Sequence, residues 1–224
     1  MHRRMRSLGS ALALAVSLAA PAAADQDFAK KFYNAREAFT ELMESPDRGV
    51  PEWLLERTKC VAVIPSVIKG AFIWGGRHGR GVMSCRDEAG TWSPPMFVKI
   101  SGGSVGFQAG GESTDLVLFF LTERGVRSLL DTKFVLGGDV GLAAGPLGRS
   151  AEATTDLRFK AEIYSYARSK GLYAGVSIEG ARLAPDYAWA RGFYGERVWP
   201  DEVLFRHEVP RMTPDAQAFV DVLP

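Results

Sequence analysis

The chain has 224 residues, of which 46% are hydrophobic and 24% are charged, as in an ordinary globular protein. This length favours one domain. Removing the three arginines of the N-terminal leader described next leaves 24 of the 27 basic residues against 26 acidic ones, a net charge of −2. A near-neutral chain is not drawn as a whole to nucleic acid or to anionic lipid, so any such binding needs a local patch.

The first residues have the pattern of an export signal. Three arginines precede an apolar stretch at residues 8–20, and alanines follow at 22–24, directly before Asp25. We therefore expect residues 1–24 to be a secretory signal peptide and residues 25–224 to be the mature domain, which would be periplasmic or extracellular. A membrane anchor is the alternative, and whether export uses the general or the twin-arginine route stays open.

Helices are expected first along the mature chain. Apolar residues recur at spacings of three and four over residues 27–44, which places them on one helical face: Phe28, Phe32, Ala35, Phe39 and Leu42. A second short helix is expected from Pro51.

From residue 60 the pattern changes to strands separated by Gly and Pro turns. We expect strands at 60–65, 71–75, 80–86, 96–100, 104–109, 115–121, 134–143, 159–168 and 172–179. Short helices are expected at 122–131 and 185–194. This order predicts a single α+β domain, with a strongly curved, Gly-rich antiparallel or barrel-like sheet, N-terminal amphipathic helices and short inserted helices.

Residues 101–149 are unusually rich in glycine within apolar, strand-like runs. Glycine weakens a strand, so we expect bulges, tight bends or close backbone contacts there. The polar run Glu112, Ser113, Thr114 and Asp115 leads directly into an apolar strand. We interpret it as a structural motif at the start of a strand, whose side chains form hydrogen bonds with backbone groups, in preference to a catalytic carboxylate site.

Two cysteines open and close apolar runs that would become neighbours if the runs paired antiparallel. A Cys60–Cys85 disulfide and two buried thiols are both compatible with this arrangement. Only His78 and His207 follow the leader, so we expect no metal site.

One short pattern resembles a catalytic motif. Residues 102–106 match G-x-S-x-G, with Ser104 at the nucleophile position. A nucleophile elbow needs a helix after the serine, whereas a Gly-rich run follows here. An esterase is therefore a minor hypothesis, and no nucleotide-binding motif or cofactor site is expected.

Basic residues occur beside aromatic ones in two places. Lys69, Arg77, His78 and Arg80 lie around an expected hairpin, and the helix at 27–44 adds Lys30, Lys31 and Arg36. Either group could bind lipid phosphates. Alternatively, the first group could lie on a solvated loop and the second on a helix packed against the sheet.

An ordered series of short runs resembles the SYLF domain family. IPSVIKGAFIWGG at residues 64–76 is similar to the opening signature of the family. Later pieces follow in family order: Gly81-Val82, WSPP at 92–95, GGSVG at 102–106, ESTDLV at 112–117, GPLGR from Gly145 to Arg149, EATTD at 152–156, YSYARSKGL at 164–172 and GVSIEG at 175–180. The resemblance covers about residues 30–205.

The resemblance implies a lipid-binding domain that is not an enzyme. Eukaryotic members bind phosphoinositides and in some cases actin, often beside a Src-homology domain. For this exported, stand-alone chain we expect a phospholipid surface as partner, without actin or nucleic acid. The expected lipid contacts are Phe28, Lys30, Lys31, Phe32, Arg36, Lys69, Arg77, His78 and Arg80. A protein–protein interaction module of the envelope is the alternative.

Overall fold

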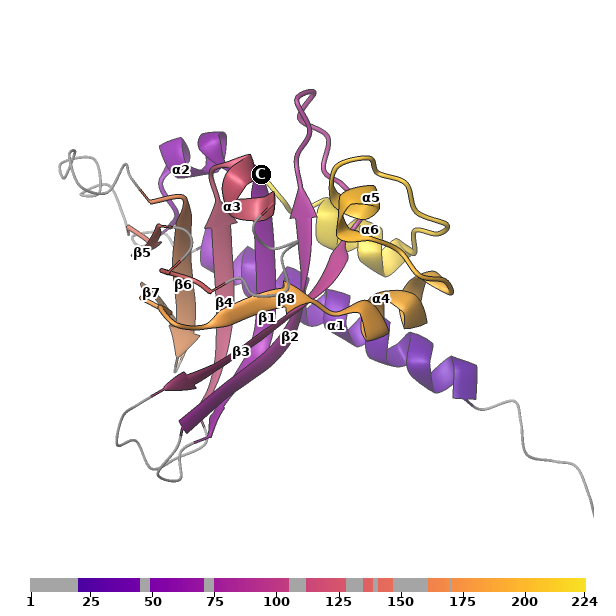
Figure 1. Cartoon of the computed structure of the whole chain (residues 1–224), viewed down its shortest axis with the longest axis horizontal. Coiled ribbons are helices and arrows are strands. Elements are labelled where there is room, and N and C mark those ends of the chain that lie inside the picture. The colour runs from indigo at the N-terminus through magenta and orange to yellow at the C-terminus, as the bar shows by residue number, and fades with distance from the viewer. Residues whose placement is uncertain are drawn as a thin grey trace, which may run out of the picture.

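The structure is a computed structural model that describes residues 20–44, 49–70, 75–104, 112–127, 135–138, 141–146, 161–169 and 171–224. Helices and one sheet make up the described part (Figure 1). The helices are α1 (Ala20–Met43), α2 (Glu52–Arg57), α3 (Glu123–Arg127), α4 (Tyr187–Tyr194), α5 (Pro200–Leu204) and α6 (Pro214–Val220). The strands are β1 (Cys60–Gly70), β2 (Gly75–Cys85), β3 (Met96–Ser104), β4 (Glu112–Phe120), β5 (Leu142–Ala144), β6 (Ile163–Ser169), β7 (Leu172–Gly175) and β8 (Arg182–Pro185).

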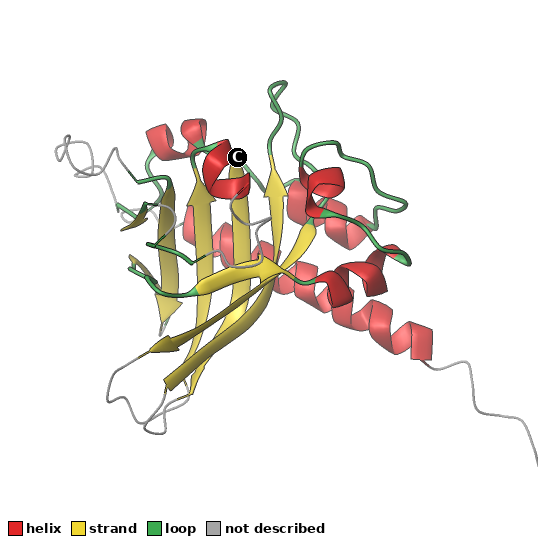
Figure 2. Ribbon diagram, in the orientation of Figure 1, coloured by secondary structure: helices red, strands yellow, loops and turns green. Residues whose placement is uncertain are grey.

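The sheet is strongly curled. Its strand order is β5-β6-β4-β1-β2-β3-β8. Strand β7 pairs with the second half of β6, from Tyr166 to Ser169. Figure 2 shows long strands bending into a half-barrel, with β8 lying across them in this view and α1 passing behind. The expected α+β fold with a curved sheet is therefore confirmed.

Glycine at the centre of β2 permits part of this curvature. A Cβ atom added to Gly81 would lie 2.0 Å from the Val63 carbonyl oxygen and 2.6 Å from the Ile64 Cα atom. Only a residue without a side chain allows β1 to fold this closely over β2. The close approach that the sequence suggested for glycines of this chain is thus present, although at a position before residue 101.

Helix α1 covers one face of the sheet, which we call the α1 face. The rings of Phe28 and Phe32 lie 5.7 and 5.5 Å from the Phe97 ring of β3, between centroids. Both also contact Phe193 of α4, at 5.5 and 5.2 Å. The opposite face, enclosed by the curl, is called the inner face. None of the helices in the described residues combines the length and the apolar character needed to cross a membrane.

Several expected elements differ from the structure. Helix α1 begins at Ala20, inside the expected leader, and β1 extends to Gly70. The expected strand at 71–75 lies outside the described residues except for Gly75, which opens β2, and most of the expected strand at 104–109 also lies outside them. Pairing is not wholly antiparallel, because β5 runs parallel to β6. The sequence also gave no signal for β8, whose four residues are too few for a clear alternation.

Candidate functional site

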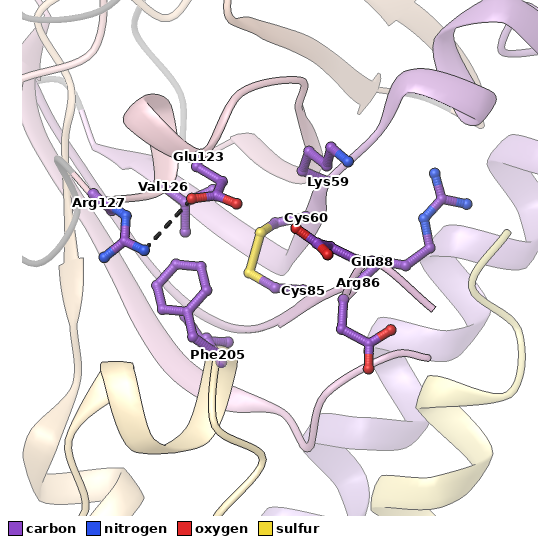
Figure 3. A pocket seen from close by; sticks show the side chains of 11 residues that line it. Lys59, Cys60, Cys85, Arg86, Glu88, Glu123, Val126, Arg127 and Phe205 are labelled. Carbon is purple, nitrogen blue, oxygen red and sulfur yellow. Dashed lines mark hydrogen bonds and ion pairs between the residues drawn. A yellow bond between two sulfur atoms is a disulfide. The ribbon is translucent and has the colours of Figure 1, made fainter. Parts of the chain in front are cut away.

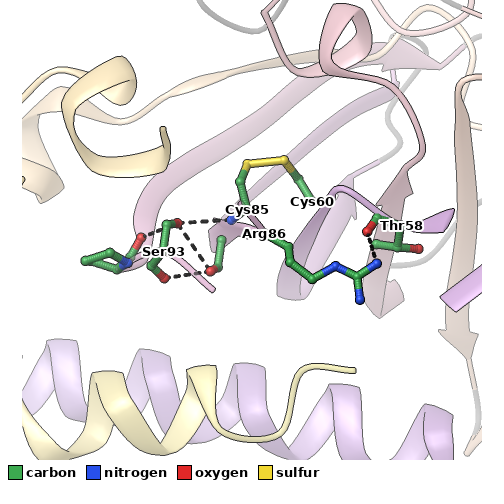
Figure 4. The surroundings of a disulfide bond; sticks show 7 residues. Thr58, Cys60, Cys85, Arg86 and Ser93 are labelled. Carbon is green, nitrogen blue, oxygen red and sulfur yellow. Dashed lines mark hydrogen bonds between the residues drawn. A yellow bond between two sulfur atoms is a disulfide. The ribbon is translucent and has the colours of Figure 1, made fainter. Parts of the chain in front are cut away.

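A disulfide joins the first two strands of the sheet. Cys60 and Cys85 lie directly opposite each other in the β1–β2 ladder, and their sulfur atoms are bonded (Figure 4). The Ser93 hydroxyl accepts a hydrogen bond from the Cys85 backbone N–H at 3.0 Å. On the other side, Arg86 donates to the Thr58 carbonyl at 2.8 Å. The antiparallel pairing proposed from the sequence is confirmed, and of the two alternatives the disulfide is present.

A pocket of about 230 Å³ opens beside this disulfide (Figure 3). Its charged groups are mixed in sign, and Arg127 pairs with Glu123 at 3.5 Å while lying over the Phe205 ring. Asp87 and Glu88 add two further carboxylates to the lining. A pocket with this charge balance offers little attraction to an anionic ligand. No group of three or more His, Cys, Asp or Glu suitable for a metal ion occurs in the described residues.

Two of the nine expected lipid contacts are core residues. Phe28 is 8% exposed and Phe32 is 1% exposed. Each ring is packed against β3 and α4, so the apolar stripe of this helix is explained by packing on the sheet. We therefore leave both phenylalanines out of the candidate lipid surface.

Two of the expected basic residues meet at one aromatic ring. Lys31 of α1 donates a hydrogen bond to the Arg80 carbonyl oxygen at 3.1 Å. The Lys31 Nζ atom and the Arg80 guanidinium lie 5.8 and 5.5 Å from the centroid of the Trp189 ring. Arg80 also binds the buried Asp186 at 2.8 Å, although its own side chain is 45% exposed. Helix α1, strand β2 and helix α4 each contribute residues to this cluster.

The β2–β3–β8 register extends the cluster along the sheet. Arg80 lies opposite Lys99 of β3, and Ser101 of β3 lies between His78 of β2 and Arg182 of β8. Residues directly opposite in a ladder point to one face, and Lys99 is two positions from Phe97, which contacts α1. All four basic side chains are exposed on the α1 face. With Lys31 they form what we call the basic strip: Lys31, His78, Arg80, Lys99 and Arg182.

Electrostatic repulsion operates inside the strip. Burial lowers the pKa of Lys31, and the positive charges of Arg80 and Lys30 lower it further. Arg80 and Lys99, both cationic, occupy directly opposite ladder positions, an arrangement that destabilises a sheet. Asp186 compensates Arg80, and the two ladder rows themselves contain no carboxylate. An anion bound at this surface would relieve the repulsion.

The remaining expected contacts are dispersed. Lys30 is exposed on α1, whereas Arg36 stacks on the Tyr33 ring at 5.4 Å and pairs with Glu37 at 3.7 Å. Arg77 lies opposite Lys69 in the β1–β2 ladder, one residue out of step with His78, so its side chain lines the inner face. The Lys69 side chain lies outside the described part.

Sequence reasoning missed Lys99 and Arg182. The sequence criterion was a basic residue beside an aromatic one near an expected loop, and neither residue meets it. Arg182 also belongs to β8, the strand that the sequence did not predict. Their membership of the strip depends on register across three strands. The alternation Lys99-Ile100-Ser101, with Ile100 buried, was the signal that could have placed Lys99 on an exposed face.

The polar run at the start of β4 is structural in part. Asp115 accepts a hydrogen bond from the Ser66 backbone N–H at 2.8 Å, as expected for a residue that satisfies a backbone group. Ser113 is exposed, and the Glu112 side chain lies outside the described part, as does Arg149. Thr114 is buried, and its hydroxyl has no hydrogen-bond partner in the described structure.

Gly145 and Ser104, two other residues of the Gly-rich region, have separate settings. A Cβ atom on Gly145 would lie 2.2 Å from the Tyr166 ring, so this glycine permits the chain to pass the ring. Ser104 is the last residue of β3, and the next described element is a strand. Residues 105–111, where a nucleophile elbow would place its helix, lie outside the described residues.

Comparison with known proteins gives a consistent result. Residues 101–224 match the family described as "Ysc84: Las17-binding protein actin regulator". The chain is 40% identical over 161 residues to the protein YSC84 of Saccharomyces cerevisiae, a match that covers 70% of this chain and 34% of the yeast protein. It is 36% identical over 180 residues to the human SH3 domain-containing YSC84-like protein 1, covering 79% of this chain and 52% of the relative. The chain thus spans between a third and about half of the length of these relatives.

Proposed function

Because the chain belongs to the Ysc84 family, the SYLF family of the sequence analysis, we propose that it is a binding protein whose basic strip attaches it to anionic phospholipid surfaces. The chain is proposed to act as a peripheral protein of the cell envelope after export. Its relatives carry the names of binding proteins and SH3-domain proteins, in keeping with a non-catalytic role.

The observation that carries the proposal is the concentration of like charge on exposed side chains of the α1 face. Arg80 and Lys99 oppose each other, Lys31 is desolvated beside Arg80, and Arg182 lies in the neighbouring row. Each Lys or Arg near an anionic membrane contributes about 1 kcal/mol of attraction. Four such side chains on a chain with nearly balanced total charge provide the local patch that composition alone did not reveal.

An apolar side chain accompanies the charges. Ile68 of β1 lies opposite His78 of β2, in the ladder row that also contains Arg182. Its side chain is 59% exposed. A large aliphatic residue beside cations suits the boundary between headgroups and acyl chains, where apolar contacts add to electrostatic attraction. The sheet face, in place of the apolar side of α1, is the surface we propose to meet the membrane.

Co-sedimentation with phosphatidylglycerol vesicles tests this proposal. We expect the purified protein to pellet at low salt and to be released progressively as salt rises, because the attraction is screened. The double variant Lys99→Glu/Arg182→Glu should bind at least tenfold more weakly, since it reverses two charges of the strip. The matched control is Lys59→Glu/Arg124→Glu, which changes the total charge equally at exposed positions by the disulfide and in α3.

The outcomes separate membrane binding from a protein-binding role. Equal loss in both double variants would point to net charge, and no pelleting of the wild-type protein at low salt would refute the proposal. The family description names Las17 binding for relatives, so a protein partner is the second candidate. That candidate predicts partner capture that survives in Lys99→Glu/Arg182→Glu together with absence of vesicle binding.

A further inference from the structure

A second candidate site lies on the inner face of the sheet, away from the basic strip. A half-open pocket of about 300 Å³ lies between the strands and the segment that follows β7. Most of its lining is apolar, with Val67, Leu116, Ala167 and Ile178 among the contributing side chains. The polar residues of the lining are Arg77, Thr114 and Ser177.

Arg77 and Thr114 each contain a buried polar atom that has no hydrogen-bond partner among the described residues. The Arg77 Nε atom and the Thr114 hydroxyl are shielded from solvent, and neither makes a hydrogen bond within the described structure. Thr114 is only 5% exposed. A buried donor or hydroxyl left unsatisfied costs about 1–3 kcal/mol, so native proteins rarely keep one without a reason. Here the two residues that carry such atoms line the same pocket.

The ladder register shows how the polar and apolar parts are arranged. Arg77 lies on β2, Val67 on β1, Thr114 and Leu116 on β4, and Ala167 on β6. These strands are consecutive in the sheet, and neighbouring strands are about 4.8 Å apart, so the lining spans roughly 14 Å. Arg77 belongs to the strand at one end of this span, and the apolar residues Leu116 and Ala167 belong to the strands toward the other end. The site is therefore amphipathic along its length.

We propose that this cavity binds a fatty acid, with its carboxylate at Arg77 and Thr114 and its single hydrocarbon chain along Leu116, Ala167 and Ile178. A guanidinium and a hydroxyl together donate to a planar carboxylate, and one cation balances its single charge. The volume is at the lower end of the range for ligand pockets, which suits one chain and is too small for a two-chain phospholipid.

Burial is consistent with this assignment. It lowers the pKa of Arg77, because the charged form loses hydration there. A guanidinium nevertheless remains protonated in proteins, so an anion in the cavity would meet a full positive charge that water solvates poorly. The site does not rest on membrane attachment, since its residues face the other side of the sheet from the basic strip.

Titration calorimetry with octanoate, decanoate and dodecanoate, each below its micelle concentration, tests the proposal. Each added CH₂ group that enters the cavity is worth about fourfold in affinity, so two carbons should give roughly 16-fold. Arg77→Met should weaken dodecanoate binding at least tenfold, and Thr114→Val about threefold, because they remove a charged and a neutral donor. Ala167→Phe fills the cavity and should abolish binding.

Thermal unfolding of each variant identifies those that remain folded, and the Thr114→Val and Ala167→Phe results stand if Arg77→Met does not fold. Lys99→Glu/Arg182→Glu should bind dodecanoate within twofold of wild type, which separates this site from the basic strip. Absence of dodecanoate binding, affinity independent of chain length, or equal affinity in the folded cavity variants would overturn the proposal. Binding of a lysophospholipid in place of dodecanoate would overturn the carboxylate assignment.

Discussion

The Ser66 backbone N–H donates a hydrogen bond to Asp115 Oδ1 at 2.8 Å, and Ser66 has a φ angle of 56°. The two residues meet where the pairing of β1 with β4 and with β2 shifts register, between Val63 and Ile68. A bulge leaves a backbone group outside the ladder, and the Asp115 carboxylate supplies the missing acceptor. The bulge also determines which residues of β1 face α1 and which face the inner cavity.

Asp115→Ala should therefore lower the free energy of unfolding by about 1.5–3 kcal/mol, the range for a hydrogen bond to a charged group. The substitution also removes the ion pair between Asp115 and Arg168, whose atoms are 3.7 Å apart. Urea unfolding measures the change. Asp115→Asn keeps an acceptor without the charge, so it should cost less. Equal midpoints for the Ala variant and wild type would contradict the role assigned to this carboxylate.

The left-handed backbone of Ser66 makes a separate prediction. A β-branched residue is strongly disfavoured at positive φ, so Ser66→Val should lose about 1–3 kcal/mol of stability. Ser66→Gly relieves the strain but increases the entropy of the unfolded chain, and we expect it to stay within about 1 kcal/mol of wild type. Thermal and urea unfolding of both variants check the order. A Val variant as stable as the Gly variant would refute it.

Gly81 and Gly76 form a matched pair within β2. Gly81→Ala would place a Cβ atom 2.0 Å from the Val63 carbonyl oxygen, a backbone atom that cannot move aside alone. A Cβ atom on Gly76 meets nothing within 4 Å. We expect Gly81→Ala to cost at least about 3 kcal/mol and Gly76→Ala to change stability by less than about 0.5 kcal/mol. Similar urea midpoints for the two variants would show that the close approach does not limit this strand.

Local patterns in the sequence were sufficient for some features and not for others. The phenylalanine spacing of α1 predicted a helix with one apolar face, but the same stripe suits a membrane surface and a packed core. Only the position of Phe97 beneath Phe32 distinguishes them. In the same way, Cys60 and Cys85 could be expected to approach each other because each bounds an apolar run, while the bond required the ladder register.

The basic strip could not be assembled from the sequence because its residues come from four elements. Lys99 and Arg182 are 83 positions apart in the sequence. In the β3–β8 ladder they are diagonal neighbours, because Lys99 pairs with Ala184 and Ser101 pairs with Arg182. Arg77 and Arg80 are three positions apart, yet an odd spacing in a strand sends them to opposite faces. Proximity in sequence thus grouped residues that the sheet separates, and it missed residues that the sheet brings together.

The disulfide should stabilise the domain without affecting vesicle binding by the basic strip. Its half-cystines are 25 residues apart, so cross-linking is expected to add roughly 3 kcal/mol through the unfolded chain. Cys60→Ala/Cys85→Ala should lower the urea midpoint accordingly, and a reductant should shift the wild-type protein but not the variant. Vesicle binding of the folded variant should equal that of wild type. An unchanged midpoint in the variant would contradict the stabilising role.

Buried tyrosines should make the protein sensitive to alkali. Burial raises the pKa of Tyr166, Tyr173 and Tyr194, whose hydroxyls donate to backbone carbonyls. In the unfolded chain a tyrosine loses its proton near pH 10, so above that pH the native state binds more protons and stability falls. Each such tyrosine contributes about 1.4 kcal/mol per pH unit, or roughly 4 kcal/mol for three.

Urea unfolding between pH 10.5 and 11.5 tests this slope. The lowered pKa of Lys31 acts in the opposite sense, but its effect on the slope fades as the pH rises past the unfolded lysine value of about 10.4, because the unfolded lysine then loses its proton as well. Tyr194→Phe should lose about 1 kcal/mol at neutral pH, because the Pro95 carbonyl loses its donor. Its stability should then fall by about 1.4 kcal/mol less per pH unit than that of wild type. Parallel pH profiles would show that Tyr194 titrates normally in the folded protein.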